Sequence, residues 1–117
     1  MNEVTERTGL QFPVGSIGSG YCFFGSRIDD ELAIKVLIPN EKRSDFMKND
    51  LFQSGNQNKP SLQVGRNQVW WKLDELNKRK DYTKQLPREK YVECCFGKEK
   101  GKLIAFISWM DTGVLSE

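Results

Sequence analysis

The residues best suited to binding chemistry form a mixed aromatic and basic segment in the middle of the chain. Two adjacent tryptophans are followed by four basic residues, namely Trp70, Trp71, Lys72, Lys78, Arg79 and Lys80. Aromatic rings stack on nucleobases and lysines pair with phosphates, so this segment suits a nucleic acid. It equally suits an acidic protein, with Trp71 as the central anchor and the basic residues as a charged rim. The structural alternatives are a packed tryptophan and a solvated helix end.

A second charged candidate is the acidic triplet Asp29, Asp30 and Glu31. Carboxylates bind hard cations, but the ligand spacing of an EF-hand loop is absent around this triplet. Acidic residues in a turn are usually solvated. The functional alternative is an acidic knob that contacts a basic protein surface, such as that of a nuclease.

The composition argues against most catalytic sites. The chain contains no histidine, which removes the commonest general base together with Ser–His and Cys–His pairs. Its three cysteines, Cys22, Cys94 and Cys95, cannot complete an all-cysteine zinc site. Cys94 and Cys95 are adjacent and would project to opposite faces of a strand. We therefore expect buried, reduced thiols, no cofactor, no metal and no enzymatic activity.

Residues 17–37, IGSGYCFFGSRIDDELAIKVL, are similar to the start of a protein kinase. Gly18 and Gly20 match the first two glycines of the phosphate-covering loop, and Lys35 matches the phosphate-binding lysine of the following strand. The pattern departs from the family at Phe23, which occupies the third glycine position, and no H-R-D or D-F-G motif follows. The sequence therefore predicts a glycine-containing hairpin with Lys35 exposed on a strand, and no ATP site.

The strongest secondary-structure signal lies in residues 91–109, YVECCFGKEKGKLIAFISW. Two apolar runs flank a polar linker at residues 97–102, whose glycines can adopt a positive φ, and this pattern predicts a β-hairpin. The second run, residues 103–109, is apolar on both faces. We therefore expect it to form a central strand that is covered on both sides.

The other elements are predicted from shorter patterns. We expect an edge strand at residues 10–14, a hairpin of residues 21–24 and 32–38, and helices at residues 41–53 and 68–80. The second helix follows from the helical spacing of Val69, Leu73 and Leu76, which leaves Trp71 off the apolar stripe. Residues 1–9 are expected to be loosely ordered, and residues 81–88 to form a polar connection.

Together these elements predict one α+β domain over residues 1–117. Its core is a mainly antiparallel sheet of four or five strands, in the order β-β-β-α-α-β-β, with two helices mainly on one face. The longest apolar run, residues 103–107, is too short to span a bilayer, so no membrane association is expected. The polar N-terminal segment is not typical of a signal peptide, which favours a cytoplasmic location.

By elimination, the sequence favours a small protein-binding module without catalytic activity. The predicted class is an inhibitor that neutralises a partner protein, as immunity proteins and antitoxins do with bacterial toxins or nucleases. The alternative is a nucleic-acid-associated module that uses Trp71 and residues 72–102, which carry ten basic against six acidic side chains, a net charge of +4. An accessory subunit or an enzyme of unusual chemistry is a third interpretation.

Overall fold

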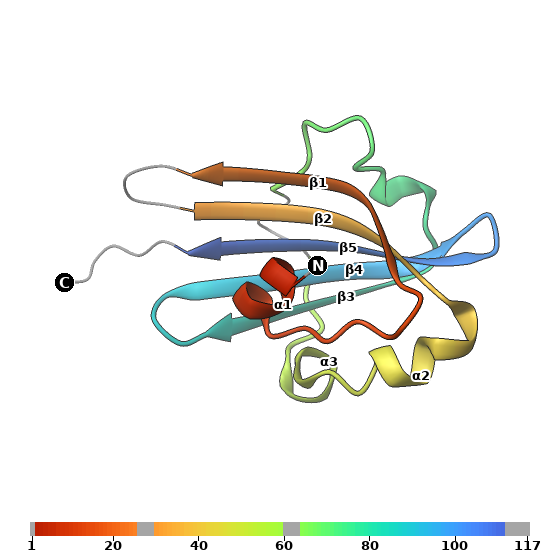
Figure 1. Ribbon diagram of the computed structural model, residues 1–117, viewed down its shortest axis with the longest axis horizontal. Helices are drawn as coiled ribbons and strands as arrows, with labels where there is room; N and C mark the ends of the chain where they lie inside the picture. The colour runs from red at the N-terminus through yellow and green to blue at the C-terminus, as the bar shows by residue number, and fades with distance from the viewer. Residues whose placement is uncertain (1, 26–29, 60–63, 112–117) are drawn as a thin grey trace.

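A five-stranded antiparallel sheet forms the centre of the protein, with strands in the order β1-β2-β5-β4-β3 (Figure 1). The computed structural model describes residues 2–25, 30–59 and 64–111. The strands are β1 (Ile17–Gly25), β2 (Asp30–Ile38), β3 (Asn77–Leu86), β4 (Lys90–Glu99) and β5 (Lys102–Asp111). The helical elements are α1 (Asn2–Thr8), η1 (Asn40–Lys42), α2 (Arg43–Phe46), α3 (Asp50–Ser54) and η2 (Leu73–Glu75). The predicted α+β class is confirmed.

The hairpin of β4 and β5 is the best-predicted part of the fold. Strand β5 lies between β2 and β4, and its residues 103–109 are all buried, as expected for a central strand. The strands extend further into the predicted linker than expected, because Glu99 still pairs with Lys102. The connection is a two-residue turn at Lys100 and Gly101, which have φ angles of 53° and 78°. Positive φ at both positions is typical of a tight turn whose twist matches that of the strands.

One face of the sheet, called here the helical face, is covered by α1, residues 10–16, α2 and α3. Alternate residues of β2, β4 and β5 point to this face and pack with Val4, Leu10 and the aromatic ring of Phe46. Four rings form the centre of this packing, with centroid separations of 5.0 to 6.3 Å: Phe46, Phe52, Tyr82 and Phe96. This cluster is the larger part of the hydrophobic core.

The opposite face, called here the loop face, is covered by residues 64–76. Trp71, Leu73 and Leu76 pack there against β4 and β5, where they contact Cys95, Ile104 and Phe106 as one cluster. The backbone N–H of Val64 donates a hydrogen bond of 3.1 Å to the buried hydroxyl of Ser108, which fixes one end of this segment to the sheet. The sheet is therefore covered on both sides, although only one side carries α-helices.

The predicted helix at residues 68–80 is wrong. Leu73 and Leu76 are buried, but Val69 is 86% exposed, so the three residues do not form one stripe. Only η2 is helical in this region, and residues 77–86 form the edge strand β3. Strand β3 therefore also replaces most of the polar connection predicted at residues 81–88. Its polar composition reflects the position at the sheet edge, where charged side chains remain in water.

The predicted helix at residues 41–53 is interrupted, and the cause is Asn49. Its side-chain amide donates to the carbonyl of Phe46 at 2.7 Å, which separates α2 from α3. The same side chain accepts from the N–H of Gln11 and donates to its carbonyl. Gln11 thereby bonds to a side chain rather than to a strand, so the strand predicted at residues 10–14 is wrong. Residues 2–8, within the segment expected to be loosely ordered, form helix α1.

Candidate functional site

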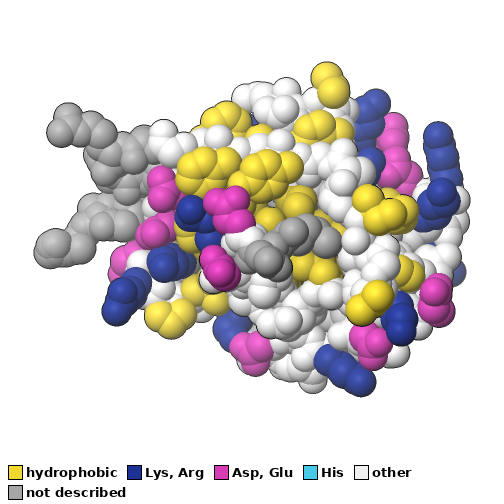
Figure 2. Space-filling model, in the orientation of Figure 1, with side chains coloured by type: hydrophobic (Ala, Val, Ile, Leu, Met, Phe, Trp, Pro, Cys, Tyr) yellow, Lys and Arg dark blue, Asp and Glu magenta, His cyan; other side chains and the backbone are white. Residues whose placement is uncertain are grey.

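Strand β1 is an exposed edge of the sheet with an unusual composition. It pairs only with β2 among the named strands, and its nine residues, IGSGYCFFG, carry no charge. Six large hydrophobic side chains are exposed among the described residues, and four belong to β1: Ile17, Tyr21, Phe23 and Phe24. Figure 2 shows hydrophobic side chains gathered over the position that β1 has in Figure 1. An uncharged edge with exposed rings is a template for pairing with another chain.

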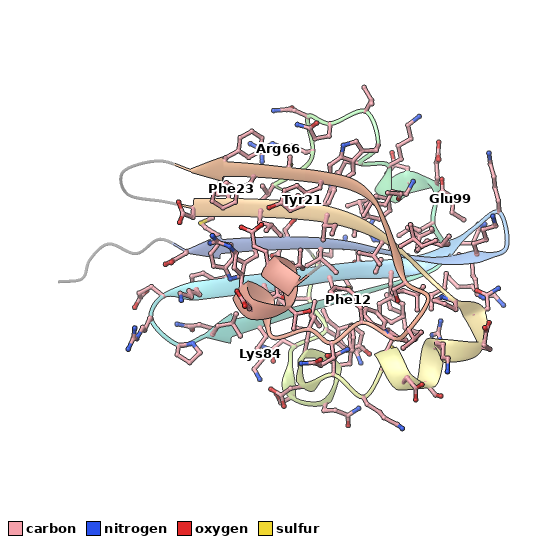
Figure 3. All side chains as sticks on the ribbon, in the orientation of Figure 1. Phe12, Tyr21, Phe23, Arg66, Lys84 and Glu99 are labelled. Carbon is pink, nitrogen blue, oxygen red and sulfur yellow. The ribbon has the colours of Figure 1, made fainter. Side chains whose placement is uncertain are left out.

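Helix α1 holds two of these rings in place on the helical face. The hydroxyl of Tyr21 donates a hydrogen bond of 2.9 Å to Oε1 of Glu3. The guanidinium of Arg7 lies 4.9 Å from the ring centre of Phe23 and forms an ion pair of 3.2 Å with Glu3. Figure 3 shows Tyr21 and Phe23 on β1, on the side of the sheet that carries α1. Desolvation and the hydrogen bond to Glu3 raise the pKa of Tyr21, so this hydroxyl stays a neutral donor at physiological pH.

An apolar hollow of about 550 Å³ lies beside these rings. We call it the β1 hollow; its wall consists of residues 18–21 of β1 with Glu3 and Val4 of α1 and Ile34 of β2. The minimal side chains of Gly18 and Ser19 leave this space open, whereas the side-chain position of Gly20 faces the ring of Trp70 on the loop face. The pairing of β1 with β2 also shifts register between Gly18 and Gly20, as in a β-bulge. Strand β1 therefore carries both the exposed apolar ring of Phe23 and part of the wall of an apolar cavity.

The opposite edge of the sheet, strand β3, is protected in three ways. Its first half carries Lys78, Arg79 and Lys80, and its register with β4 shifts between Asn77 and Lys80. Its outer side is covered at Thr83, whose backbone exchanges two hydrogen bonds of 2.8 Å with Asn56. Edge charges, bulges and covering loops all prevent pairing between sheets. Strand β1 carries a bulge but lacks the charges of β3, and within residues 2–25, 30–59 and 64–111 it has no isolated bridge such as that at Thr83.

Trp71 is 9% exposed and belongs to the packing of the loop face. Its ring lies 5.1 Å from that of Phe106 and 5.8 Å from that of Trp70. This position agrees with the packing alternative and leaves little ring surface for stacking a base or anchoring an interface. Trp70 is more exposed, and its ring covers Gly20 so closely that an added Cβ there would lie 2.3 Å from it.

The four predicted basic residues do not form a helix end. Lys72 lies outside β3 and approaches Glu75 at 3.9 Å. Lys78, Arg79 and Lys80 belong to β3, and Arg79 forms an ion pair of 2.8 Å with Asp81. The hydrogen bond to Asp81 raises the pKa of Arg79. Lys78, Arg79 and Lys80 therefore line the protected edge, on the far side of the sheet from β1, whereas Lys72 lies on the segment that covers the loop face.

The predicted acidic knob is not a single surface in the described part of the chain. Asp29 lies outside the described residues. Asp30 and Glu31 are the first residues of β2 rather than part of a turn, so their side chains alternate between the two faces. Asp30 approaches Arg7 at 3.9 Å and so adds a carboxylate to the charged group beside Phe23.

Lys35 is not at the exposed position that was predicted. Its ammonium forms an ion pair of 3.2 Å with Glu99 and lies 5.5 Å from the ring centre of Phe106. The prediction was wrong because the loop face is covered by residues 64–76, which the sequence did not show. Lys35 is therefore a partly buried residue whose ammonium is paired with the Glu99 carboxylate of β4.

The three thiols differ in their access to reagents. Cys94 and Cys95 are buried in the clusters of the helical and loop faces, respectively, and Cys22 is partly exposed. Desolvation raises the pKa of all three thiols, most of all for the two buried ones. Because Cys94 belongs to the cluster of the helical face and Cys95 to that of the loop face, the adjacent cysteines of β4 point to opposite faces, as predicted.

We expect native protein at mildly alkaline pH to react with DTNB at Cys22 alone, and more slowly than free cysteine does. A raised pKa means that the reactive thiolate forms at higher pH, so the rate should still be climbing where free cysteine has levelled off. Denaturant should expose Cys94 and Cys95 as well. The control is Cys22→Ser, which should abolish the native reaction; rapid native labelling of that variant would contradict the assigned burial.

Sequence reasoning missed Glu3, Arg7 and the edge position of β1. The spacing of Glu3 and Arg7, an i, i+4 pair of opposite charge, was a usable helix signal. In the described ranges, no group of three or more Cys, Asp, Glu or His side chains could hold a metal ion. No helix in those ranges is long and apolar enough to cross a bilayer.

The chain matches no protein-family model, no curated protein and no solved structure. The candidate site is therefore interpreted from its own chemistry.

Proposed function

We propose that this protein is a non-catalytic binding module of the immunity or antitoxin type, which neutralises a partner protein such as a bacterial toxin or nuclease. The proposed site of action is the cytoplasm. The observation that supports this proposal is the uncharged aromatic edge β1. A strand of the partner that adds to such an edge gains backbone hydrogen bonds for affinity, and side-chain contacts supply specificity.

Tyr21 and Phe23 have the properties of interface anchors. They are 46% and 39% exposed, so both can bury further ring surface on binding. Glu3 and Arg7 already hold them, which lowers the entropy lost when a partner fixes their positions. Aromatic anchors of this kind often dominate binding energy within an interface of roughly 800 Å² per partner. Glu3, Arg7 and Asp30 would form part of its polar rim.

The nucleic-acid alternative has less support from the geometry. Trp71 is packed in the core, and both Lys72 and Arg79 have carboxylate partners. Strand β1 itself carries no cation, and Arg7 beside Phe23 is paired with Glu3 and Asp30, whereas neutralisation of phosphates provides most of the affinity for nucleic acid. A protein partner is therefore the better match to the exposed surface.

The test compares wild-type protein with Phe23→Asp and with the matched control Val69→Asp. Both substitutions place a carboxylate at an exposed apolar position, but Val69 lies on the segment that covers the loop face. Protein captured from lysate of the source cell would be identified, purified and titrated. Phe23→Asp should weaken its binding about 30-fold or more, the effect of losing a hot-spot residue, whereas Val69→Asp should leave the Kd within about twofold.

Thermal unfolding of both variants checks that they remain folded. Equal binding by wild-type and Phe23→Asp protein would contradict the use of β1. Recovery of RNA or DNA in place of a protein, with log affinity falling linearly as log salt rises, would support the alternative instead.

A further inference from the structure

We infer that β1 also pairs with β1 of a second copy of this chain, in an antiparallel dimer centred on Tyr21 that competes with the partner. This inference rests on the proposed function, since it assigns a regulation to the same strand. In the dimer, Phe23 of each copy enters the β1 hollow of the other. The two sheets then continue into one another across the shared edge.

The order of residues in β1 is self-complementary. The three residues before Tyr21 are small, Gly18, Ser19 and Gly20, and the three after it are larger, Cys22, Phe23 and Phe24. An antiparallel pair centred on Tyr21 places the larger half of each strand against the small half of the other. A symmetric dimer requires this kind of surface, in which a residue i contacts j while j contacts i.

The ring and the hollow lie on the correct face for this exchange. Phe23 and Tyr21 are two residues apart and both interact with α1, so they share the helical face. The β1 hollow opens on that face, because its wall includes Val4 of α1 and Ile34 of β2. Counted from Tyr21, the symmetric register sets Phe23 opposite Ser19, which lines the hollow. The β-bulge between Gly18 and Gly20 adds a residue at this point without adding a large side chain.

Charge favours this edge over the other for self-pairing. Strand β1 has no charged residue, so two copies meet without like-charge repulsion along the strands. Strand β3 carries Lys78, Arg79, Lys80 and Lys84, and two copies of it would bring cations together. Self-pairing through β1 also satisfies outward-facing backbone groups that an edge strand leaves in water.

The consequence is that dimer and partner complex exclude each other. The dimer buries Tyr21 and Phe23, which are the proposed anchors for the partner. As the concentration of the protein rises, a growing fraction is dimeric and the apparent affinity for the partner falls in proportion to the remaining monomer. The edge strand β1 is thereby paired in the dimer until a partner strand that binds more tightly displaces the second copy.

Sedimentation velocity over a concentration series tests the association. Wild-type protein should shift from monomer to dimer as its concentration rises, and Val69→Asp should follow the same curve. Phe23→Asp should raise the dimer dissociation constant at least tenfold. Ser19→Trp, which fills the hollow and leaves Phe23 unchanged, should do the same.

Cross-linking tests the register, with Cys22→Ser as the background to remove the partly exposed thiol. Tyr21→Cys in this background should form an intermolecular disulfide on oxidation, because residues facing one another across an antiparallel pair approach disulfide distance. Phe24→Cys should cross-link at least tenfold more slowly, since it lies three residues from the centre of the register and the two copies of residue 24 do not face one another.

The outcomes separate this inference from the proposed function. A protein that stays monomeric throughout, or whose dimer survives both Phe23→Asp and Ser19→Trp, overturns self-pairing through β1; capture of a partner through β1 would still support the proposed function. Dimerisation with selective Tyr21→Cys cross-linking supports self-pairing. If that dimer captures no protein partner, the proposed function fails although the self-pairing stands.

Discussion

Replacing Ile107 with alanine should lower the free energy of unfolding by about 2–5 kcal/mol, the range for deleting buried methyl groups. Ile107 is fully buried in β5, where it pairs with Ile34 of β2 and Cys94 of β4. Its side chain lies in the main cluster of the helical face, within the most regular part of the sheet. The surrounding strands are fixed by backbone hydrogen bonds, so they can close the resulting cavity only in part. Denaturant unfolding monitored by tryptophan fluorescence measures the loss.

The matched control is Val69→Ala, which removes methyl groups at a position that is 86% exposed. We expect this control to change stability by less than about 0.5 kcal/mol, as surface substitutions usually do. The denaturant dependence of both variants should equal that of wild-type protein, which shows that only stability has changed. An Ile107→Ala effect no larger than that of the control would mean that β5 is not the centre of the core.

Where burial and strand pattern agree, the sequence predicted the fold. The run at residues 103–109 is apolar on both faces, and only a covered central strand accommodates such a run. The turn glycine Gly101, in a polar linker between two mainly apolar runs, indicated the hairpin locally. Both signals act through neighbouring residues, so they can be read without knowing the rest of the chain.

The errors arose where contacts between distant residues decide the local structure. Leu73 and Leu76 have helical spacing. Both are nevertheless buried on the loop face by an irregular segment that contains only a short 3-10 turn. The segment at residues 77–86 contains few residues that favour strands, and its pairing with β4 overrides that weak preference. Neither result could be derived from a window of sequence.

The candidate site was hidden for a related reason. Tyr21, Phe23 and Phe24 were recognised as an aromatic strand, but an uncharged strand normally indicates a buried position. Only the strand order, which places β1 at the edge, makes the same composition an exposed surface. Trp71 shows the reverse case, because it was a candidate anchor by composition and is packed against Phe106.

Asn49→Ala should destabilise the protein by about 2–4 kcal/mol, because it removes the side-chain partner of the Gln11 N–H and C=O groups in a part-buried place and one of the two partners of the buried Phe46 carbonyl. The Asn49 side chain is 7% exposed and makes three hydrogen bonds. It accepts from the N–H of Gln11 at 2.6 Å and donates to the carbonyls of Gln11 and Phe46 at 2.9 and 2.7 Å. These bonds join residues 10–16 to the α2–α3 region, across 38 positions of sequence. Their loss should also loosen the packing of Leu10 and Phe12 over the helical face.

The matched control is Asn40→Ala, since the Asn40 amide also makes three hydrogen bonds but is exposed. It donates to the carbonyl of Gly101 at 3.0 Å and accepts from the N–H of Leu103 and from Nζ of Lys98 at 3.0 and 3.1 Å. Water can replace an exposed amide, so this loss should be about 1 kcal/mol or less. Burial, rather than the number of bonds, is thus expected to separate the two asparagines in denaturant unfolding. Equal losses would show that water reaches Gln11 and Phe46 once the Asn49 amide is removed, and that residues 10–16 are not held to the sheet by this side chain.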